Sequence, residues 1–196
     1  DGLSRPMSVR DQLASALERN DERPNVALAE HLAAAQDHAG IAELAAALSD
    51  PTVAVQNDAI TVLYEIGDRR PELAAPHLTA FLALLGSRNN RNIWGALSAN
   101  DTVTALVPKD VAARLDAILA AADRSSVIAK DKLMSILSKL ARADDPRAMS
   151  ILLDRLETAA TNQLPMYAEL AALAVSHREA PRLRRIIGTR LADIDQ

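Results

Sequence analysis

Apolar residues recur every 37 positions along this chain, and this period constrains the fold more than any other feature. The step separates Ile41, Leu78, Leu115 and Leu152. Internal repeats of about 20–50 residues are typical of arrays of stacked units. Four further columns keep the same register: Ala45, Leu82, Leu119 and Leu156; Ala59, Ala96, Leu133 and Leu170; Ile60, Leu97, Met134 and Ala171; Val62, Ala99, Ile136 and Leu173.

Within each segment the apolar residues follow helical spacing. Positions 41, 44, 45 and 48, and positions 59, 62, 63 and 66, form i, i+3, i+4, i+7 series, which is one face of a helix. Each segment therefore predicts a two-helix hairpin with one apolar stripe per helix. Because a single hairpin cannot bury both stripes, neighbouring hairpins are expected to stack around a continuous core. Nothing in the sequence predicts a strand, so the expected fold class is all-α.

The stretch Leu48–Gly67, LSDPTVAVQNDAITVLYEIG, resembles a HEAT repeat. Its Asp-Pro turn and its apolar positions fall where that family's pattern places them, although Gln56 stands where the family usually has a basic residue. The resemblance implies a right-handed α–α superhelix, a HEAT-like or armadillo-like solenoid, of about five helical hairpins plus a final helix. It also implies that the second helices line the concave side. The matching residues are Asp50, Pro51, Ala59, Ile60, Leu63, Ile66 and Gly67.

The unbroken period predicts a single domain over residues 1–196. Residues 1–36 depart from the register and are expected to form an N-terminal capping hairpin, whose first helix starts at Ser8. Residues 37–176 hold the repeats, and residues 177–196 hold a C-terminal helix. The expected helices are 25–36, 37–49, 52–67, 71–85, 89–106, 108–122, 125–142, 146–159, 161–176 and 180–193. Pro76 and Pro165 lie inside first turns, so two of these helices are expected to begin later.

Composition argues against several classes of function. The chain has 26 acidic and 22 basic residues, a formal net charge of −4, which argues against a nucleic-acid or anionic-membrane partner. It has no cysteine, so disulfides and thiolate chemistry are absent. No apolar run is long enough to cross a membrane, and the first ten residues do not resemble a secretory signal. A cytoplasmic location is expected.

No catalytic motif accompanies the repeats. The four histidines, His31, His38, His77 and His177, form no H-x-x-x-H pair, and the six glycines form no phosphate-binding loop. HEAT-like metal oxygenases use His-Glu pairs as iron ligands, and none occurs here. We therefore expect no enzyme activity, no metal and no cofactor.

The candidate binding residues lie on the sides of the second helices that point away from the apolar stripe. Trp94, the only tryptophan, follows Arg91 by one helical turn, and buried tryptophan and arginine are enriched at binding hot spots. Gly95 would let a ligand or a neighbouring helix approach closely. The alternative is that Trp94 fills a gap left by small residues. The sequence therefore allows either a packing role or a binding role for Trp94. The candidate residues are Asn57, Asp58, Arg91, Trp94, Asp131, Lys132 and Lys139.

These observations favour a protein-interaction or scaffold module that presents a concave helical surface to another protein. The alternative is a small HEAT-like enzyme or nucleic-acid-processing protein with a pocket near Trp94. Self-association through the terminal hairpins is also expected to be possible, because the apolar ends of a stack are exposed.

The charge balance gives a first testable prediction. The protein should show little affinity for duplex DNA at physiological salt, because it lacks the excess of basic residues that phosphate contacts require. An electrophoretic mobility shift over a range of salt concentrations measures this. A submicromolar, salt-sensitive shift would contradict the charge argument.

Overall fold

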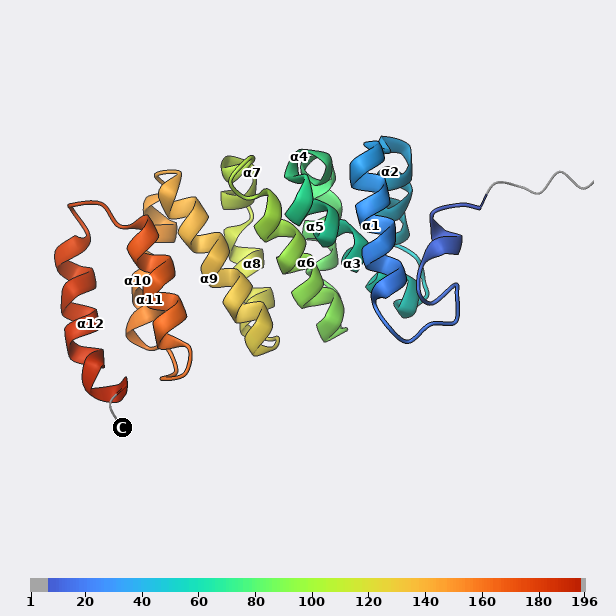
Figure 1. Cartoon of the computed structure of the whole chain (residues 1–196). Helices are drawn as coiled ribbons and strands as arrows, with labels where there is room; N and C mark the ends of the chain where they lie inside the picture. Colours follow the sequence, from blue (N-terminus) through green and yellow to red (C-terminus); the bar gives the residue numbers. More distant parts are fainter. Residues whose placement is uncertain (1–6, 195–196) are drawn as a thin grey trace, which may run out of the picture.

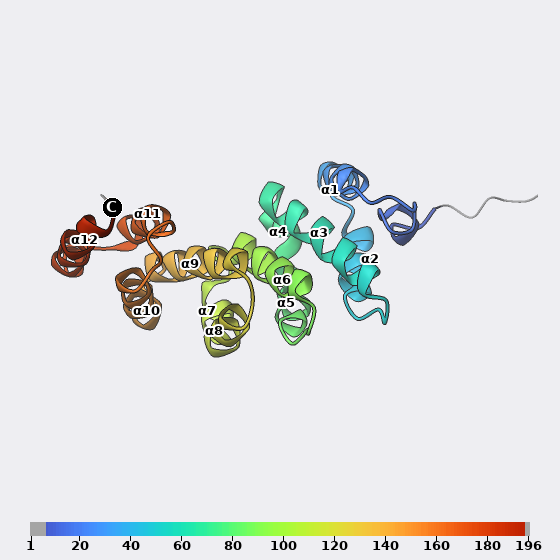
Figure 2. The same cartoon turned by 90° about the horizontal axis from the view of Figure 1, so that it is seen from below.

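The computed structural model describes residues 7–194, and these residues form helices and turns with no strand. The all-α prediction is confirmed. The helices lie side by side in an elongated row (Figure 1), and the row is two layers deep (Figure 2). None of the described helices is both long enough and apolar enough to cross a membrane.

The two layers correspond to the first and second members of the hairpins. The second layer has the order α1, α3, α6, α9, α11, and each of these helices packs on the next (Figure 2). Its bounds are α1 Arg23–Ala35, α3 Val53–Arg69, α6 Asn90–Val103, α9 Val127–Arg142 and α11 Leu164–Ala174. The first layer holds α2 His38–Ala47, α4 Pro71–Ala74 with α5 Leu78–Leu84, α7 Pro108–Ala112 with α8 Leu115–Asp123, and α10 Pro146–Glu157. The last helix, α12 Ala180–Ile194, packs beside α10.

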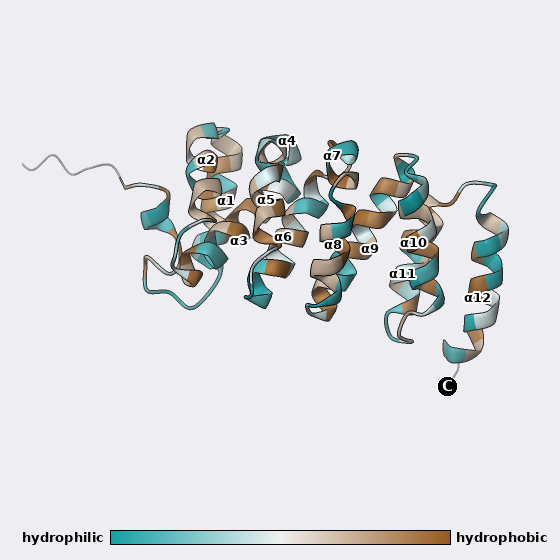
Figure 3. Ribbon diagram, turned by 180° about the vertical axis from the view of Figure 1, so that it is seen from behind, coloured by the Kyte–Doolittle hydropathy of each residue, from teal (hydrophilic) through white to brown (hydrophobic). Residues whose placement is uncertain are grey.

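The core consists of the residues that the 37-residue period selects. Ile41, Leu78, Leu115 and Leu152 are each at most 8% exposed, and the columns that begin at Ala59 and Ile60 are buried through α9. The columns also have less buried members, because Leu119 on α8 and Leu170 on α11 are only partly buried and Leu173 is 63% exposed at the end of α11. Hydrophilic residues gather at the helix ends and turns, as the view from behind shows (Figure 3).

Two glycines allow α3 and α6 to pack closely. A Cβ added at Gly67 on α3 would lie 2.7 Å from Thr102 Cβ on α6. A Cβ added at Gly95 on α6 would lie 2.9 Å from Ile60 Cγ2 on α3. Each helix therefore contributes one glycine, and the partner's side chain occupies the space that a methyl group would need. The neighbouring helix that Gly95 admits is thus the preceding second helix.

Arginines connect the first-layer helices, which otherwise pack little against one another. Arg155 of α10 forms a two-pronged pair with Asp123 of α8, with Nη1–Oδ1 2.6 Å and Nη2–Oδ2 2.9 Å. Arg190 of α12 donates to the carbonyl oxygens of Glu157 and Ala159 at 2.8 and 2.6 Å, at the C-terminal end of α10. Similar bridges are Arg124 to the carbonyls of Leu85 and Ser87, Arg147 to Asp116 and Arg182 to Asp154.

The expected first helix from Ser8 is wrong. Only a short 3₁₀ turn forms there, η1 (Arg10–Gln12), and Leu13 is extended with φ −67° and ψ 150°. The N–H of Ala14 donates to Asn25 Oδ1 at 2.9 Å, and the N–H of Ser15 donates to Asp58 Oδ2 at 2.8 Å. Because side chains from α1 and α3 take these two backbone donors, the i→i−4 ladder of a helix does not continue.

Two predicted first helices are each divided. The break in 71–85 falls at η2 (Ala75–His77), where Pro76 cannot donate. The break in 108–122 falls at Arg114, with no proline nearby. His77 and Arg114 are 37 positions apart and share one backbone conformation, φ −103° ψ 12° and φ −114° ψ 18°. These two repeats therefore share the break, with a proline at only one of them, whereas the equivalent position in the next repeat, Ile151, lies inside the unbroken helix α10.

The remaining boundaries follow the predictions closely. Asp145 caps α10 by accepting from the N–H of Ala148 at 2.8 Å. Helix α11 begins at Leu164, later than the start of the predicted helix 161–176, as expected from Pro165. The proposed capping segment, 1–36, and the C-terminal segment, 177–196, both extend into residues outside the described part, 1–6 and 195–196.

The close contact at Gly67 predicts that glycine-to-alanine substitution destabilises the fold there and stabilises it at a glycine with open space around it. Gly67→Ala should lower the free energy of unfolding by about 1–3 kcal/mol, because the added methyl overpacks against Thr102. Gly188→Ala on α12 is the matched control, since its added Cβ meets nothing within 4 Å. That variant should gain up to about 1 kcal/mol from helix propensity. Urea unfolding followed by circular dichroism compares the two, and an equal gain in both would refute the close approach.

Candidate binding surface

The seven residues singled out from the sequence lie on three consecutive second-layer helices. Asn57 and Asp58 are on α3, Arg91 and Trp94 on α6, and the other three on α9. The structure brings Asn57, Asp58 and Arg91 together around one cavity near the N-terminal end. The α9 residues Asp131, Lys132 and Lys139 do not line that cavity. The predicted ribbon is therefore divided into two parts.

Asp58 does not point freely outward as the sequence predicted. It is only 7% exposed. Its Oδ2 accepts from the N–H of Ser15 at 2.8 Å, and its Oδ1 accepts from the Nδ2 amide of Asn25 at 2.8 Å. The carboxylate thus anchors the N-terminal turn and α1 to α3, and the donors it uses are both uncharged.

Arg91 belongs to the same polar network. Its guanidinium pairs with Glu22, and Glu22 in turn accepts from Asn25 Nδ2 at 3.2 Å. Asn25 is fully buried, and its Oδ1 accepts from the N–H of Ala14 at 2.9 Å. We call the five residues Ser15, Glu22, Asn25, Asp58 and Arg91 the N-terminal clamp, since they connect the N-terminal turn with α1, α3 and α6.

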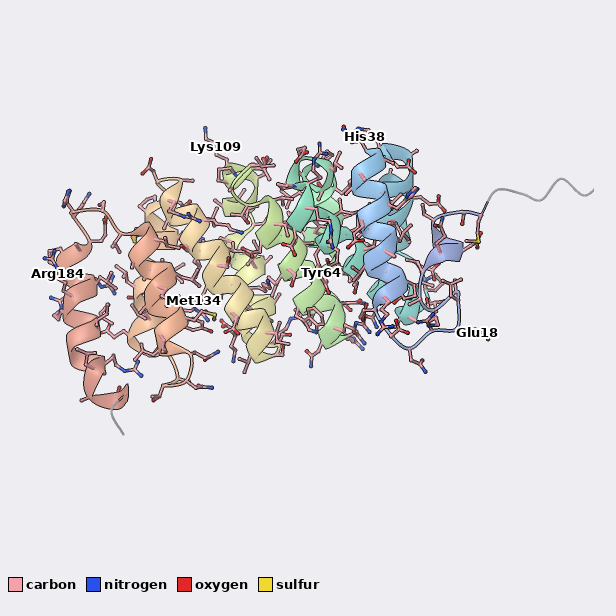
Figure 4. The ribbon with its side chains drawn as sticks, viewed as in Figure 1. Glu18, His38, Tyr64, Lys109, Met134 and Arg184 are labelled. Carbon is pink, nitrogen blue, oxygen red and sulfur yellow. The ribbon has the colours of Figure 1, made fainter. Side chains whose placement is uncertain are left out.

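A cavity of about 420 Å³ lies against this clamp. Glu18 lines this cavity, has a positive φ of 55° and lies near the N-terminal end in Figure 4. Two buried polar atoms at the cavity, Ser15 Oγ and Asn57 Oδ1, have no hydrogen-bond partner within residues 7–194. The lining residues are Ala14, Ser15, Glu18, Arg19, Asn20, Asp21, Glu22, Ala54, Asn57, Asp58 and Arg91.

Trp94 lies beside Tyr64 of the preceding second helix, and Tyr64 is close to Glu22 and Arg91, which line the cavity. The ring centroids are 6.1 Å apart and the planes are tilted by 45°. Both rings are partly buried against the core, and Tyr64 lies on the face seen in Figure 4. Trp94 therefore packs against a neighbour and still presents part of its ring. Burial raises the pKa of the Tyr64 hydroxyl, and the nearby charges of Glu22 and Glu65 add to that shift.

The α9 residues mostly contact neighbouring helices. Lys139 Nζ lies 2.9 Å from Asp101 Oδ1 and donates to the Asp101 carbonyl at 2.7 Å, which ties α9 to α6. Asp131 accepts from the Tyr167 hydroxyl at 2.8 Å and from Gln163 Nε2 at 3.0 Å, which ties α9 to the start of α11. Lys132 is partly exposed on the same helix.

Tyr64, Glu22 and Asn25 were missed from the sequence. Tyr64 could have been found, because it lies seven positions after Asn57 and so falls on the same side of the helix. Glu22 and Asn25 gave no such signal, since they lie in the segment that departs from the 37-residue register. Within residues 7–194, no group of three or more His, Asp and Glu side chains could hold a metal ion.

No family model, curated protein or solved structure matches this chain. The clamp, the cavity and the aromatic pair are therefore the observations that bear on function.

The clamp predicts that Asp58 stabilises the fold. Asp58→Ala should lower the free energy of unfolding by about 3 kcal/mol, because it leaves the Ser15 N–H and one of the two N–H groups of the Asn25 amide without an acceptor. The control is Glu169→Ala, which changes an exposed acid at the equivalent position of the repeat on α11. That change should stay within about 0.5 kcal/mol. If urea denaturation gave the same small decrease in unfolding free energy for Asp58→Ala as for Glu169→Ala, the clamp would contribute no stability.

Proposed function

We propose that this chain is a cytoplasmic protein-interaction module, built as a HEAT-like right-handed superhelix of helical hairpins, and that it binds another protein without catalysis of its own. The binding side is the second layer, α1 to α11. The mechanism is geometric, since a row of packed helices holds the contact residues in fixed positions and lowers the entropic cost of binding.

Repetition of both burial and backbone supports the solenoid. The apolar columns are buried at 37-residue intervals, and His77 and Arg114 repeat one non-helical conformation at that interval. Polar contacts between second-layer helices follow nearly the same spacing. Asn25 to Asp58, Asp101 to Lys139 and Asp131 to Tyr167 are separated by 33, 38 and 36 positions.

The observation that carries the proposed binding role is the partly exposed aromatic pair Tyr64–Trp94 beside the cavity. Aromatic side chains that keep part of their surface exposed next to an arginine are the composition of protein-binding hot spots. Arg91 lines the cavity, lies one turn before Trp94 and is close to Tyr64, which supports a binding surface that includes both the pair and the cavity.

The alternative, an enzyme or a nucleic-acid-processing protein, would use this same cavity. Its central ionisable groups, Asp58 and Arg91, are both held in the clamp. Between them, these side chains anchor the N-terminal turn and α1 to α3 and α6, and this structural use supports binding over catalysis. The acidic residues around the cavity likewise support a protein partner over nucleic acid.

The C-terminal end supports self-association as a second proposal. Leu173 and Leu191 are 63% and 52% exposed there, and Met166 on α11 is 40% exposed. Apolar side chains of this size at the end of a stack favour contact with another copy.

Site-specific photocrosslinking tests the proposed binding side. A photoreactive phenylalanine analogue placed at Lys132, on α9, should give a discrete adduct in extracts of the cells that make the protein. The same analogue at Glu43, on α2 in the first layer, is the control and should give none. Trp94→Ala should abolish the Lys132 adduct while circular dichroism keeps its helical signal. Adducts of equal yield from both positions would contradict the proposal.

A further inference from the structure

The acidic residues of the chain are concentrated in the half that holds the cavity. Residues 1–105 contain 14 acidic and 8 basic side chains, whereas residues 106–196 contain 12 acidic and 14 basic. The cavity itself is lined by four acids and two arginines. The cavity lining therefore has an excess of two acidic residues, in the half of the chain where acidic residues outnumber basic ones.

The two arginines at the cavity are already neutralised. Arg19 pairs with Asp21, with Nη2–Oδ2 2.6 Å, and Arg91 pairs with Glu22. The two remaining acids, Glu18 and Asp58, form no ion pair within residues 7–194, and Asp58 is held by uncharged donors alone. The cavity thus has two carboxylates without a counter-charge.

The unpartnered polar atoms at the cavity are both able to accept hydrogen bonds. Asn57 Oδ1 and Ser15 Oγ are buried and unbonded, and each Asp58 oxygen has a lone pair beyond the one bond it accepts. A ligand that fits this set must bring several N–H donors and a positive charge. Guanidinium and ammonium groups have both properties.

The aromatic pair extends the same chemistry along the face. Tyr64 is close to the cavity residues Glu22 and Arg91 and is paired with Trp94, and cations are attracted to the faces of such rings at distances up to about 6 Å. On α3, Glu65 follows Tyr64 but is paired with Arg69, with Oε2–Nη1 2.6 Å. Glu18 and Asp58 at the cavity are therefore the carboxylates available to a cation.

We propose that the N-terminal half of the second layer binds an extended basic peptide segment, with one arginine or lysine side chain in the cavity and the next contacts on Tyr64 and Trp94. This inference rests on the proposed binding function and adds the chemistry of the partner. The cavity volume of about 420 Å³ falls within the range of about 300–1,000 Å³ in which proteins hold compact ligand groups.

The single tryptophan gives a direct test. The probe is a labelled ten-residue peptide of alternating arginine and alanine, with the lysine–alanine and glutamate–alanine peptides for comparison. The two basic peptides should shift Trp94 emission and raise label anisotropy with a saturable, salt-sensitive dependence, and the acidic peptide should do neither. Absence of a saturable change with both basic peptides, or equal binding of the acidic one, would overturn the proposal.

A charge-removing substitution locates the site. Glu18→Asn should weaken binding of the arginine peptide about tenfold, the value expected for loss of one charge-assisted hydrogen bond. Asparagine tolerates the positive φ of 55° at this position. The matched control, Glu43→Gln on α2, should leave the dissociation constant unchanged, and equal effects of the two substitutions would overturn the assignment to the cavity.

Competition separates this inference from the function on which it rests. The arginine peptide in excess should suppress the crosslinked adduct formed from Lys132. If the adduct persists in the presence of peptide and still requires Trp94, the second layer binds a partner of other chemistry, and only the present inference fails.

Discussion

The close approach of α3 and α6 is the contact on which the binding surface depends. Gly67 and Gly95 let each helix receive a side chain of the other, so the two axes come nearer than larger residues would allow. Tyr64 is carried by one of these helices and Trp94 by the other, and the cavity is lined by the first turns of the same two. A wider spacing between α3 and α6 would separate the two rings and the cavity wall together.

The contacts between neighbouring helices differ between the two layers. Second-layer helices bury Ala, Leu, Ile and Val against one another, and dense apolar packing of this kind stabilises the fold and fixes side-chain positions. First-layer helices are connected through arginines that span from one helix to the carboxylates or terminal carbonyls of the next. Such solvent-exposed pairs contribute little to stability individually, roughly 0–1 kcal/mol each. The second layer therefore supplies most of the rigidity.

The sequence predicted the helical class and the core better than the surface. A column of apolar residues 37 positions apart indicates which side of each helix faces the other helix of its hairpin. A second-layer helix, however, contacts neighbours on three sides, so more of it is buried than one stripe indicates. For this reason Asp58, Thr61 and Ser98 are buried although they lie off the apolar stripe. The missing helix at Ser8 depends on hydrogen bonds to Asn25 and Asp58, which local patterns do not contain.

The arginine bridges of the first layer have a mechanical consequence. A long side chain that reaches across solvent can change rotamer while keeping its hydrogen bonds, whereas interlocked apolar side chains cannot slide without losing contact. A bending force on the molecule would therefore deform the contacts of the first layer before those among α3, α6 and α9. Salt screens exposed ion pairs, so it would lower the resistance of the first layer to bending.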